Sequence, residues 1–318
     1  VRLHGLLPVA QGCVRDPDLL GHVHRHAPVV ERHLRHHSLR VDVALEVRLR
    51  QFNARRNAKN FTEAEFRAAV RYCHGRGVKV YLTLNTLLFD RELSAAAQTA
   101  VLASAIGVDA ILVQDLGVLQ AVRAAAPDLP LHASTQMTVH NTDGALQARE
   151  MGLQRVVLAR EMAKEQIAAV CALEGIETEV FVHGAHCMCY SGQCAMSALI
   201  GGRSGNRGTC AQPCRLPYGV DEPAANRYPL SLKDNSLAQD LSGIRDVACL
   251  KLEGRMKRPE YVAVVTGIYA RLLEENRSPT PAEERELELA FSRSGFTDAY
   301  WRGRRGVEVF GTRPENAP

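Results

Sequence analysis

The sequence predicts an α/β fold of the TIM-barrel-like (β/α) kind, with a cysteine-rich loop inserted in it and the start of a β-rich extension after it. Between residues 78 and 184, five strand patterns alternate with helix patterns, and each strand ends in polar residues. A barrel gathers such strand ends at one site. An open dinucleotide-binding sheet would need a GxGxxG loop after its first strand, and the sequence has none there.

The alternation begins with a helix pattern over 62–74. Thr62 and Glu65 have the spacing of a capping box, and Phe66 and Val70 lie on one face. The strand pattern over 78–88 that follows is too continuously apolar to leave one face wet. Further strands are predicted over 109–115, 129–135, 155–161, 178–184, 228–232 and 248–254, and further helices over 94–106, 118–126, 143–151, 163–173, after 235, and over 259–275.

Three parts follow from this pattern: residues 1–50, a barrel over 51–276 that includes the cysteine-rich loop 183–218, and the start of a C-terminal extension over 277–318. Residues 1–50 do not share the alternation, since they hold seven of the 12 histidines and no lysine. A histidine-rich metal-binding tract is one interpretation. We favour another, that a frameshift or sequencing error has removed the first one or two strands, which resequencing of the gene would test.

The amino-acid composition limits which classes of function are possible for this protein. The 39 basic and 35 acidic side chains leave a net charge of +4, which permits an RNA partner without requiring one. No apolar run approaches the roughly 20 residues that span a bilayer, and no leader pattern opens the chain, so we expect no membrane partner and a cytoplasmic location. Five of the nine cysteines fall within 28 positions, which in a reducing compartment favours a metal site over disulfides.

Cys187, Cys194, Cys210 and Cys214 have the spacing Cys-x6-Cys-x15-Cys-x3-Cys among glycines and serines. Four thiolates can hold a tetrahedral zinc ion or a 4Fe-4S cluster. Zinc sites usually pair cysteines two to four residues apart, and only the last pair here comes close, so the spacing favours the cluster. Cysteines that merely pack beneath a loop are the alternative. Cys189 is then either a spare thiol or a misassigned ligand.

The stretch EVFVHGAHCMCYSGQCAMSALIGGRSGNRGTCAQPCR at 179–215 resembles the signature of peptidase family U32, the collagenase-like proteases. The segments FNARRNAKNFT at 52–62, HASTQMTVHN at 132–141 and LKLEGRMKRPEYVA at 250–263 resemble the same family, and the resemblance extends over 51–276. The end of the chain is similar to the entry of the C-terminal region of longer members, which suggests a truncated form. The PAG-containing and GADAVY-like strands that open family members are not found before residue 51.

This resemblance implies a barrel-like catalytic domain with one of two activities. One is cleavage of collagen-like or other peptides. The other is hydroxylation of RNA bases or of the ubiquinone ring without molecular oxygen, with a 4Fe-4S cluster and with prephenate as the oxygen source. An RNA substrate is the partner expected in the second case, and a peptide in the first.

The residues favour hydroxylation over proteolysis. A peptidase needs an activated nucleophile or a metal-bound water, and the sequence contains no HExxH or GxSxG motif. A Cys187 nucleophile paired with His183 or His186 would leave the other three cysteines without a fourth ligand. The third alternative is an inactive barrel, open because its first strands are missing.

Candidate catalytic residues lie near the last predicted strand and before the cysteines. Lys251, Glu253 and Arg255 alternate, so they point to one face of a strand. Buried charges are there for function or for mutual pairing, and both interpretations stay open. His183 is a candidate proton donor, or else a histidine that packs and holds the loop.

Candidate substrate-binding residues lie at strand ends and in the loop. Arg203 and Arg207 could clamp a dicarboxylate such as prephenate or an RNA phosphate, or else bind loop carbonyls. The remaining candidates occupy predicted strand ends and are selected on position alone: Asn85, Gln136, Arg160 and Glu161.

Overall fold

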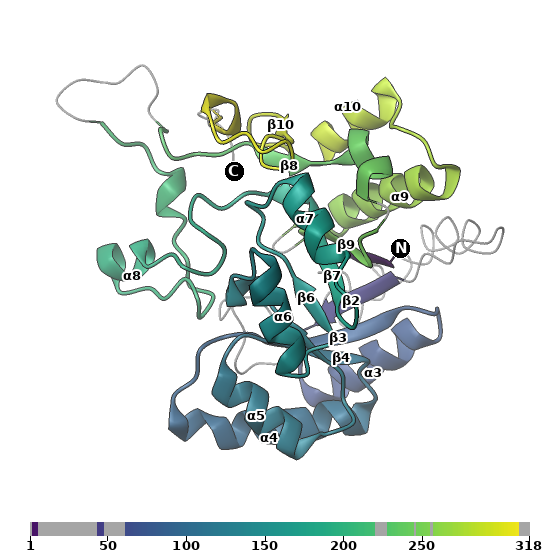
Figure 1. Cartoon of the computed structure of the whole chain (residues 1–318), viewed down its shortest axis with the longest axis vertical. Helices are drawn as coiled ribbons and strands as arrows, with labels where there is room; N and C mark the ends of the chain where they lie inside the picture. Colours follow the sequence, from purple (N-terminus) through teal and green to yellow (C-terminus); the bar gives the residue numbers. More distant parts are fainter. Residues whose placement is uncertain are drawn as a thin grey trace.

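The computed structural model describes residues 2–5, 43–47, 61–219, 228–244, 246–254 and 257–311. It confirms the predicted α/β class, because helices and strands alternate in these residues and the strands form one mostly parallel sheet. Figure 1 shows the strands at the centre with helices lying around them.

The strands follow chain order from β1 to β7, and each neighbouring pair in this run is parallel. β9 pairs in parallel with both β1 and β7, so these eight described strands form a continuous cycle of pairings. β8 is antiparallel to β7, and β10 pairs with β8. The strands are β1 (Arg2–Gly5), β2 (Val43–Val47), β3 (Lys79–Leu84), β4 (Ala110–Val113), β5 (Leu131–Ala133), β6 (Arg155–Val157), β7 (Glu177–Ala185), β8 (Asp234–Ser236), β9 (Cys249–Leu252) and β10 (Phe296–Thr297).

The helices begin where local capping dictates. The predicted capping box of Thr62 and Glu65 is confirmed, and the next two helices begin a few residues before their predicted starts because Glu92 and Asp115 cap them. The α-helices are α3 (Glu63–His74), α4 (Asp90–Ile106), α5 (Leu116–Ala125), α6 (Thr142–Glu150), α7 (Lys164–Cys171), α8 (Met196–Gly201), α9 (Pro259–Glu275) and α10 (Pro281–Ala290). Short 3-10 helices are η1 (Thr135–Met137), η2 (Pro213–Arg215), η3 (Ala238–Ile244) and η4 (Val307–Val309).

The beginning of the chain differs from our expectation. We expected the first strands to be missing from residues 1–50, yet β1 and β2 lie between β9 and β3 in the sheet. Strand pairing uses backbone N–H and C=O groups, so a basic, histidine-rich composition does not prevent it. The histidine-rich tract itself lies outside the described residues, and the frameshift stays a prediction for resequencing.

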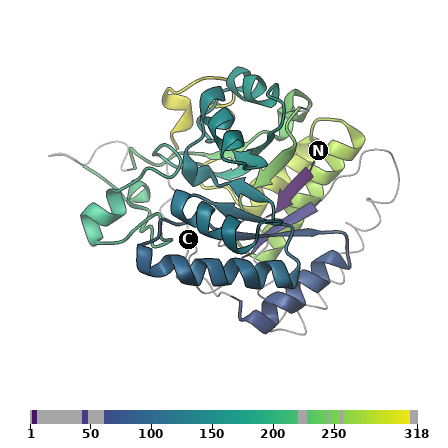
Figure 2. The same cartoon turned by 60° about the horizontal axis from the view of Figure 1, so that its bottom comes forward.

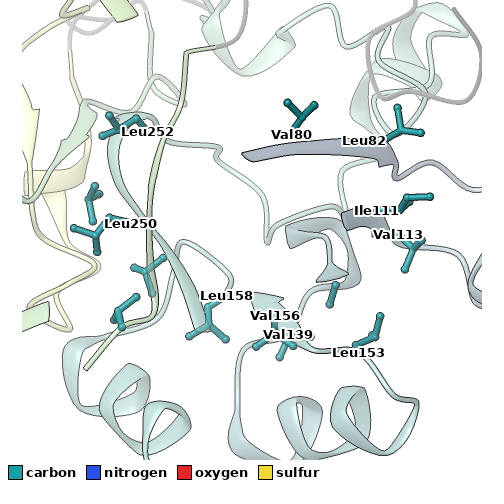
Figure 3. Packing of buried hydrophobic residues seen from close by; sticks show 14 of the residues in the cluster. Val80, Leu82, Ile111, Val113, Val139, Leu153, Val156, Leu158, Leu250 and Leu252 are labelled. Carbon is teal, nitrogen blue, oxygen red and sulfur yellow. The ribbon is translucent and has the colours of Figure 1, made fainter. Parts of the chain in front are cut away.

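Alternate residues of the central strands pack against the helices. Figure 3 shows this layer, in which Val80 and Leu82 of β3 lie near Ile111 and Val113 of β4. Full burial of each such side chain contributes about 1.5–3 kcal/mol. The opposite face of the sheet holds a smaller apolar cluster of Tyr81, Ala110, Leu112, Val157 and Phe181. Charged side chains share this second face.

A β-bulge interrupts β7. The pairing of β7 with β9 shifts register between Phe181 and His183. In a regular strand these two side chains would share a face, but a bulge re-aims the side chain that follows it. Gly184 comes next with φ of 116°, and a Cβ there would lie 2.6 Å from the Cβ of Glu253. Only glycine fits this close approach.

The last described segment returns to the sheet. β10 pairs with β8, and Leu232 forms a bridge with Phe310. Trp301 is buried, its indole N–H donates to Asp240 at 2.6 Å, and its carbonyl accepts from the Lys164 N–H. These contacts fix residues 296–311 beside the ends of β7 and β8. Of the helices in the described ranges, none has the length and apolar character needed to cross a membrane.

Candidate functional site

The five clustered cysteines lie in residues 186–215, here called the cysteine segment, which connects β7 to the part of the chain before β8. Figures 1 and 2 show this segment, with α8, projecting from one side of the molecule. All five thiols are free. Burial raises the pKa of Cys214, Arg215 opposes this, and the neighbouring Cys187, Cys210 and Cys194 raise it further. The other three predicted ligands therefore lie within electrostatic range of Cys214.

Cys189 belongs to the same group, because burial followed by Cys194 and Cys187 raises its pKa. Within the described ranges, however, no three His, Cys, Asp or Glu side chains have the arrangement of a metal site. The fit of a metal group therefore depends on donor chemistry. The Cys210 sulfur accepts from the Gln212 N–H at 3.3 Å and from the Ser197 hydroxyl at 3.7 Å. Donors of this kind favour the thiolate form, which metals require.

Asn206 ties the cysteine segment to the strand ends. Its amide nitrogen donates to Gln114 Oε1 and to Gln136 Oε1, both at 2.7 Å, and its amide oxygen accepts from the Leu87 N–H at 2.9 Å. Gln136 is a predicted site residue, whereas Asn206 was not predicted. The three partners follow β3, β4 and β5, so one side chain joins three connections of the sheet.

Arg207 secures the same part of the segment. Its guanidinium contacts Glu92 Oε2 at 2.6 Å and donates to the Leu87 carbonyl at 2.8 Å. The hydrogen bond from Arg207 lowers the pKa of Glu92 to about 2. This geometry matches the loop-stabilising alternative, and anion binding by Arg207 stays a prediction. Arg203 is exposed and lies on the surface of the segment.

Arg160 and Glu253 meet at the carboxyl ends of β6 and β9. Their side chains are 3.2 Å apart, and the Arg160 guanidinium lies 3.7 Å from the centre of the Phe181 ring. The adjacent Glu161 accepts from the hydroxyl of Ser191, a buried residue of the cysteine segment, at 3.3 Å. The structure thus brings three predicted site residues to one edge of the sheet, and Ser191 joins two of them, Arg160 and Glu161, to the segment.

Lys251 takes part in a different cluster. It is buried on the second face of the sheet, 2.7 Å from Glu179, and Arg155 lies 3.5 Å from the same carboxylate. This arrangement is the mutual pairing that the sequence left open, while a catalytic role for Lys251 stays a prediction. The third member of the predicted set, Arg255, lies outside the described residues.

Two buried histidines three residues apart have different surroundings. His183 lies against α9, with Nδ1 3.2 Å from the Tyr269 hydroxyl, and burial followed by Lys257 lowers its pKa to about 3. The bulge in β7 turns the His183 side chain toward α9. A role for His183 as a proton donor stays a prediction. His186 precedes the first cysteine, and its ring centre lies 5.0 Å from that of Tyr300, edge to face.

Several buried polar atoms without hydrogen-bond partners in the described part of the chain lie near the carboxyl ends of the strands. Asn85 is buried and donates to the Ser134 hydroxyl at 3.0 Å, but its own oxygen is unpartnered among the described residues. The hydroxyl of Thr135, Nε of Arg160 and both ring nitrogens of His186 share this state in the described structure. Buried polar groups are normally paired, so such a concentration indicates a place where another molecule or group binds.

His186 was considered only as a partner for a nucleophile, and Tyr300 carries no sequence signal because it follows the cysteines by about ninety residues.

Comparison with known proteins gives related chains of two kinds. The chain is 37% identical over 257 residues to the 23S rRNA 5-hydroxycytidine C2501 synthase of Escherichia coli, covering 79% of this chain and 38% of that protein. It is 32% identical to the tRNA hydroxylation protein P of Helicobacter pylori, covering 77% of this chain and 63% of that protein. A collagenase of Porphyromonas gingivalis is also 32% identical, with coverage of 79% and 66%.

The chain therefore spans less than two thirds of the length of the first two of these relatives. Among solved structures, the U32 peptidase Mk0906 aligns over 57% of this chain and 68% of its own, with 16% identity and a TM-score of 0.41. The family model for peptidase family U32 matches residues 44–310, which include all four predicted cysteine ligands. The chain belongs to peptidase family U32.

Proposed function

We propose that this protein is an iron-sulfur enzyme that hydroxylates a base of rRNA or tRNA without molecular oxygen. The observation that carries the proposal is the gathering of four free thiols beside polar strand ends. Its support from the comparisons is that relatives at 37% and 32% identity are named for rRNA and tRNA hydroxylation. The printed names concern those proteins, and the transfer to this chain is our proposal.

The donor set fits a 4Fe-4S cluster. Cys187, Cys194, Cys210 and Cys214 would hold it, and the hydrogen bonds that reach Cys210 are of the kind that surround cluster sulfurs. Bound there, the cluster would supply one-electron chemistry at the edge of the sheet. Cys189 is a fifth thiol within the same electrostatic environment and would be the replacement ligand if one of the four is lost.

We also infer that the cycle of strand pairings closes as a TIM-barrel-like barrel. The support is that β9 pairs on one side with β1 and on the other with β7. In such a barrel the residues after the strands converge at the carboxyl-terminal mouth, which is where barrel enzymes bind substrate. Asn85, Gln136, Arg160 and Glu161 would then face the base.

The chain's own residues can bind and orient a planar substrate there. Asn85 has an unpartnered amide oxygen that would accept from an exocyclic amine of the base. Arg160 is held by Glu253 and keeps one unpartnered N–H. Arg203 is exposed and free to approach an RNA phosphate or the carboxylates of prephenate, the co-substrate that we carry over from the family resemblance.

The second candidate is a collagenase-like peptidase. The observation in its favour is the 32% identity with the Porphyromonas gingivalis collagenase. Such an enzyme would use one thiol as nucleophile, so a single cysteine substitution would abolish peptide cleavage and removal of iron would leave it unchanged.

Metal analysis separates the two candidates. We expect about four irons and four sulfides per chain in protein purified without oxygen, and a marked loss when Cys187, Cys194, Cys210 and Cys214 are all changed to serine. Expression of the wild type, but not this variant, is expected to restore hydroxylated bases in rRNA or tRNA of a host that lacks them, measured by mass spectrometry. Metal-free, folded protein that cleaves gelatin would overturn the proposal in favour of the peptidase.

A further inference from the structure

His186 lies next to the first cysteine and has an unusual environment for a histidine. It is 4% exposed, and both ring nitrogens are unpartnered among the described residues. A buried donor without an acceptor destabilises the folded state, because it gives up its hydrogen bond to water and gains none in return. Folded proteins retain such a cost where the group contacts something that binds there.

The neighbours of His186 show which kind of group could satisfy it. The two nearby charged side chains, Arg160 and Arg215, carry only donors, so neither can accept the imidazole N–H. Arg215 already has acceptors of its own, because its guanidinium donates to the backbone carbonyl of His186 at 2.7 Å and to the Ser231 hydroxyl at 3.0 Å. The imidazole N–H therefore still needs an acceptor, which neither of these arginines supplies.

Tyr300 fixes the orientation of the ring. Its aromatic ring meets that of His186 at 76° with the centres 5.0 Å apart. The adjacent Trp301 is anchored to Asp240 and to the start of α7, so Tyr300 has little freedom to move away. Burial followed by the charge of Glu161 raises the pKa of Tyr300, Arg305 opposes this, and Cys187 raises it further, so the phenol lies within electrostatic range of the first thiol.

We propose that His186 is a residue of the cysteine site, where its imidazole N–H donates a hydrogen bond to a sulfur atom of the group that Cys187 and its partners bind. Tyr300 is the positioning residue that holds the imidazole edge-on. The proposal rests on the proposed function, because it needs a sulfur-bound group in the cysteine segment. It also explains why residues 296–311 return to this edge of the sheet.

The test measures the midpoint potential of the bound cluster in the full chain purified without oxygen. Hydrogen bonds to cluster sulfurs raise the reduction potential, so His186→Leu is expected to retain its iron and shift the potential to a more negative value. His186→Asn, which keeps an N–H donor, should move the potential back toward that of the wild type. Tyr300→Leu should shift it in the same direction as His186→Leu, and Tyr300→Phe, which keeps the ring, should not.

His183→Leu is the matched control, since His183 is equally buried but lies against α9. It is expected to change stability and leave the potential unaltered. A second readout uses metal-free protein, in which an unpartnered imidazole only costs stability. There His186→Leu should melt at the same temperature as the wild type or higher, and a clearly lower melting temperature would show that the imidazole has a partner within the chain.

The outcomes separate the two proposals. Iron-loaded wild type and His186→Leu with equal potentials would overturn the role of His186 and leave the proposed function intact. Wild type that binds no iron would overturn both. If His186→Leu does not fold, the difference between Tyr300→Leu and Tyr300→Phe decides, and equal potentials for those two variants would count against the proposal.

Discussion

Two groups of charged side chains on β6, β7 and β9 and the residues after them differ in burial and in their position relative to the cysteine segment. In the first group, Glu179 lies between Lys251 at 2.7 Å and Arg155 at 3.5 Å, all buried on the second face of the sheet. In the second group, Arg160 meets Glu253 at the strand ends but retains an unpartnered N–H among the described residues.

We interpret the first group as structural and propose that the second is available to bind another molecule. Buried charges are tolerated when they lie against opposite charges, and Glu179 has two cationic neighbours within the chain, Lys251 and Arg155. The side chains of the Arg160–Glu253 pair are 13% and 9% exposed, and Arg160 and the adjacent Glu161 contact Ser191 of the cysteine segment. The Arg160–Glu253 pair can therefore bind another molecule without first losing the contacts that it already makes.

The largest expected effect comes from breaking the Glu179 group. Lys251→Met should lower the free energy of unfolding by about 3–5 kcal/mol, because it removes the nearer of the two cations that face a buried carboxylate. Urea denaturation measures this change. Arg160→Met is the matched variant in the strand-end group and should cost less than half as much, since its pair is 13% and 9% exposed and solvent can replace it. Equal losses would remove the distinction between the two groups.

A smaller effect is expected from releasing the cysteine segment. Asn206→Ala removes three hydrogen bonds to residues that follow β3, β4 and β5. The free energy of local opening should fall by about 1–3 kcal/mol, since the glutamine oxygens lose a donor. Hydrogen exchange of backbone amides in residues 186–215 measures this opening, with α3 amides as the internal reference. Unchanged exchange in the segment would show that the cysteine segment is held by other contacts.

The smallest effect is the pH dependence of the Arg207–Glu92 pair. The folded pKa of Glu92 is lowered to about 2, below the ordinary carboxyl value of about 4.3. The pair therefore stabilises the folded state above about pH 4, and this contribution disappears as the pH falls toward 2. The difference in melting temperature between the wild type and Glu92→Gln should be constant from pH 5 to 8 and shrink below pH 4. Arg207→Ala should show the same profile, and a difference that persists undiminished at pH 3 would contradict the assignment.

Local sequence patterns account for most elements of the fold. The capping box of Thr62 and Glu65, the proline at the start of α9, and the apolar strands from β3 to β7 all act through neighbours in the chain or through simple alternation. β1 and β2 were missed because their pairing depends on backbone groups and not on composition. The face of the sheet on which His183 lies could not be predicted, because a bulge in β7 has no fixed sequence signal and re-aims the side chain that follows it.

The candidate site divides in the same way. The sequence by itself determined the family, the four candidate ligands and the polar strand ends, because thiols at characteristic spacings and polar residues after apolar strands are local features. Only the tertiary structure decided that Asn206 ties the cysteine segment to three strand ends, that Lys251 pairs with Glu179, and that Tyr300 packs on His186. These contacts join residues between 70 and 119 positions apart, and the pairing of the strands in the sheet, not any local pattern, brings them within reach.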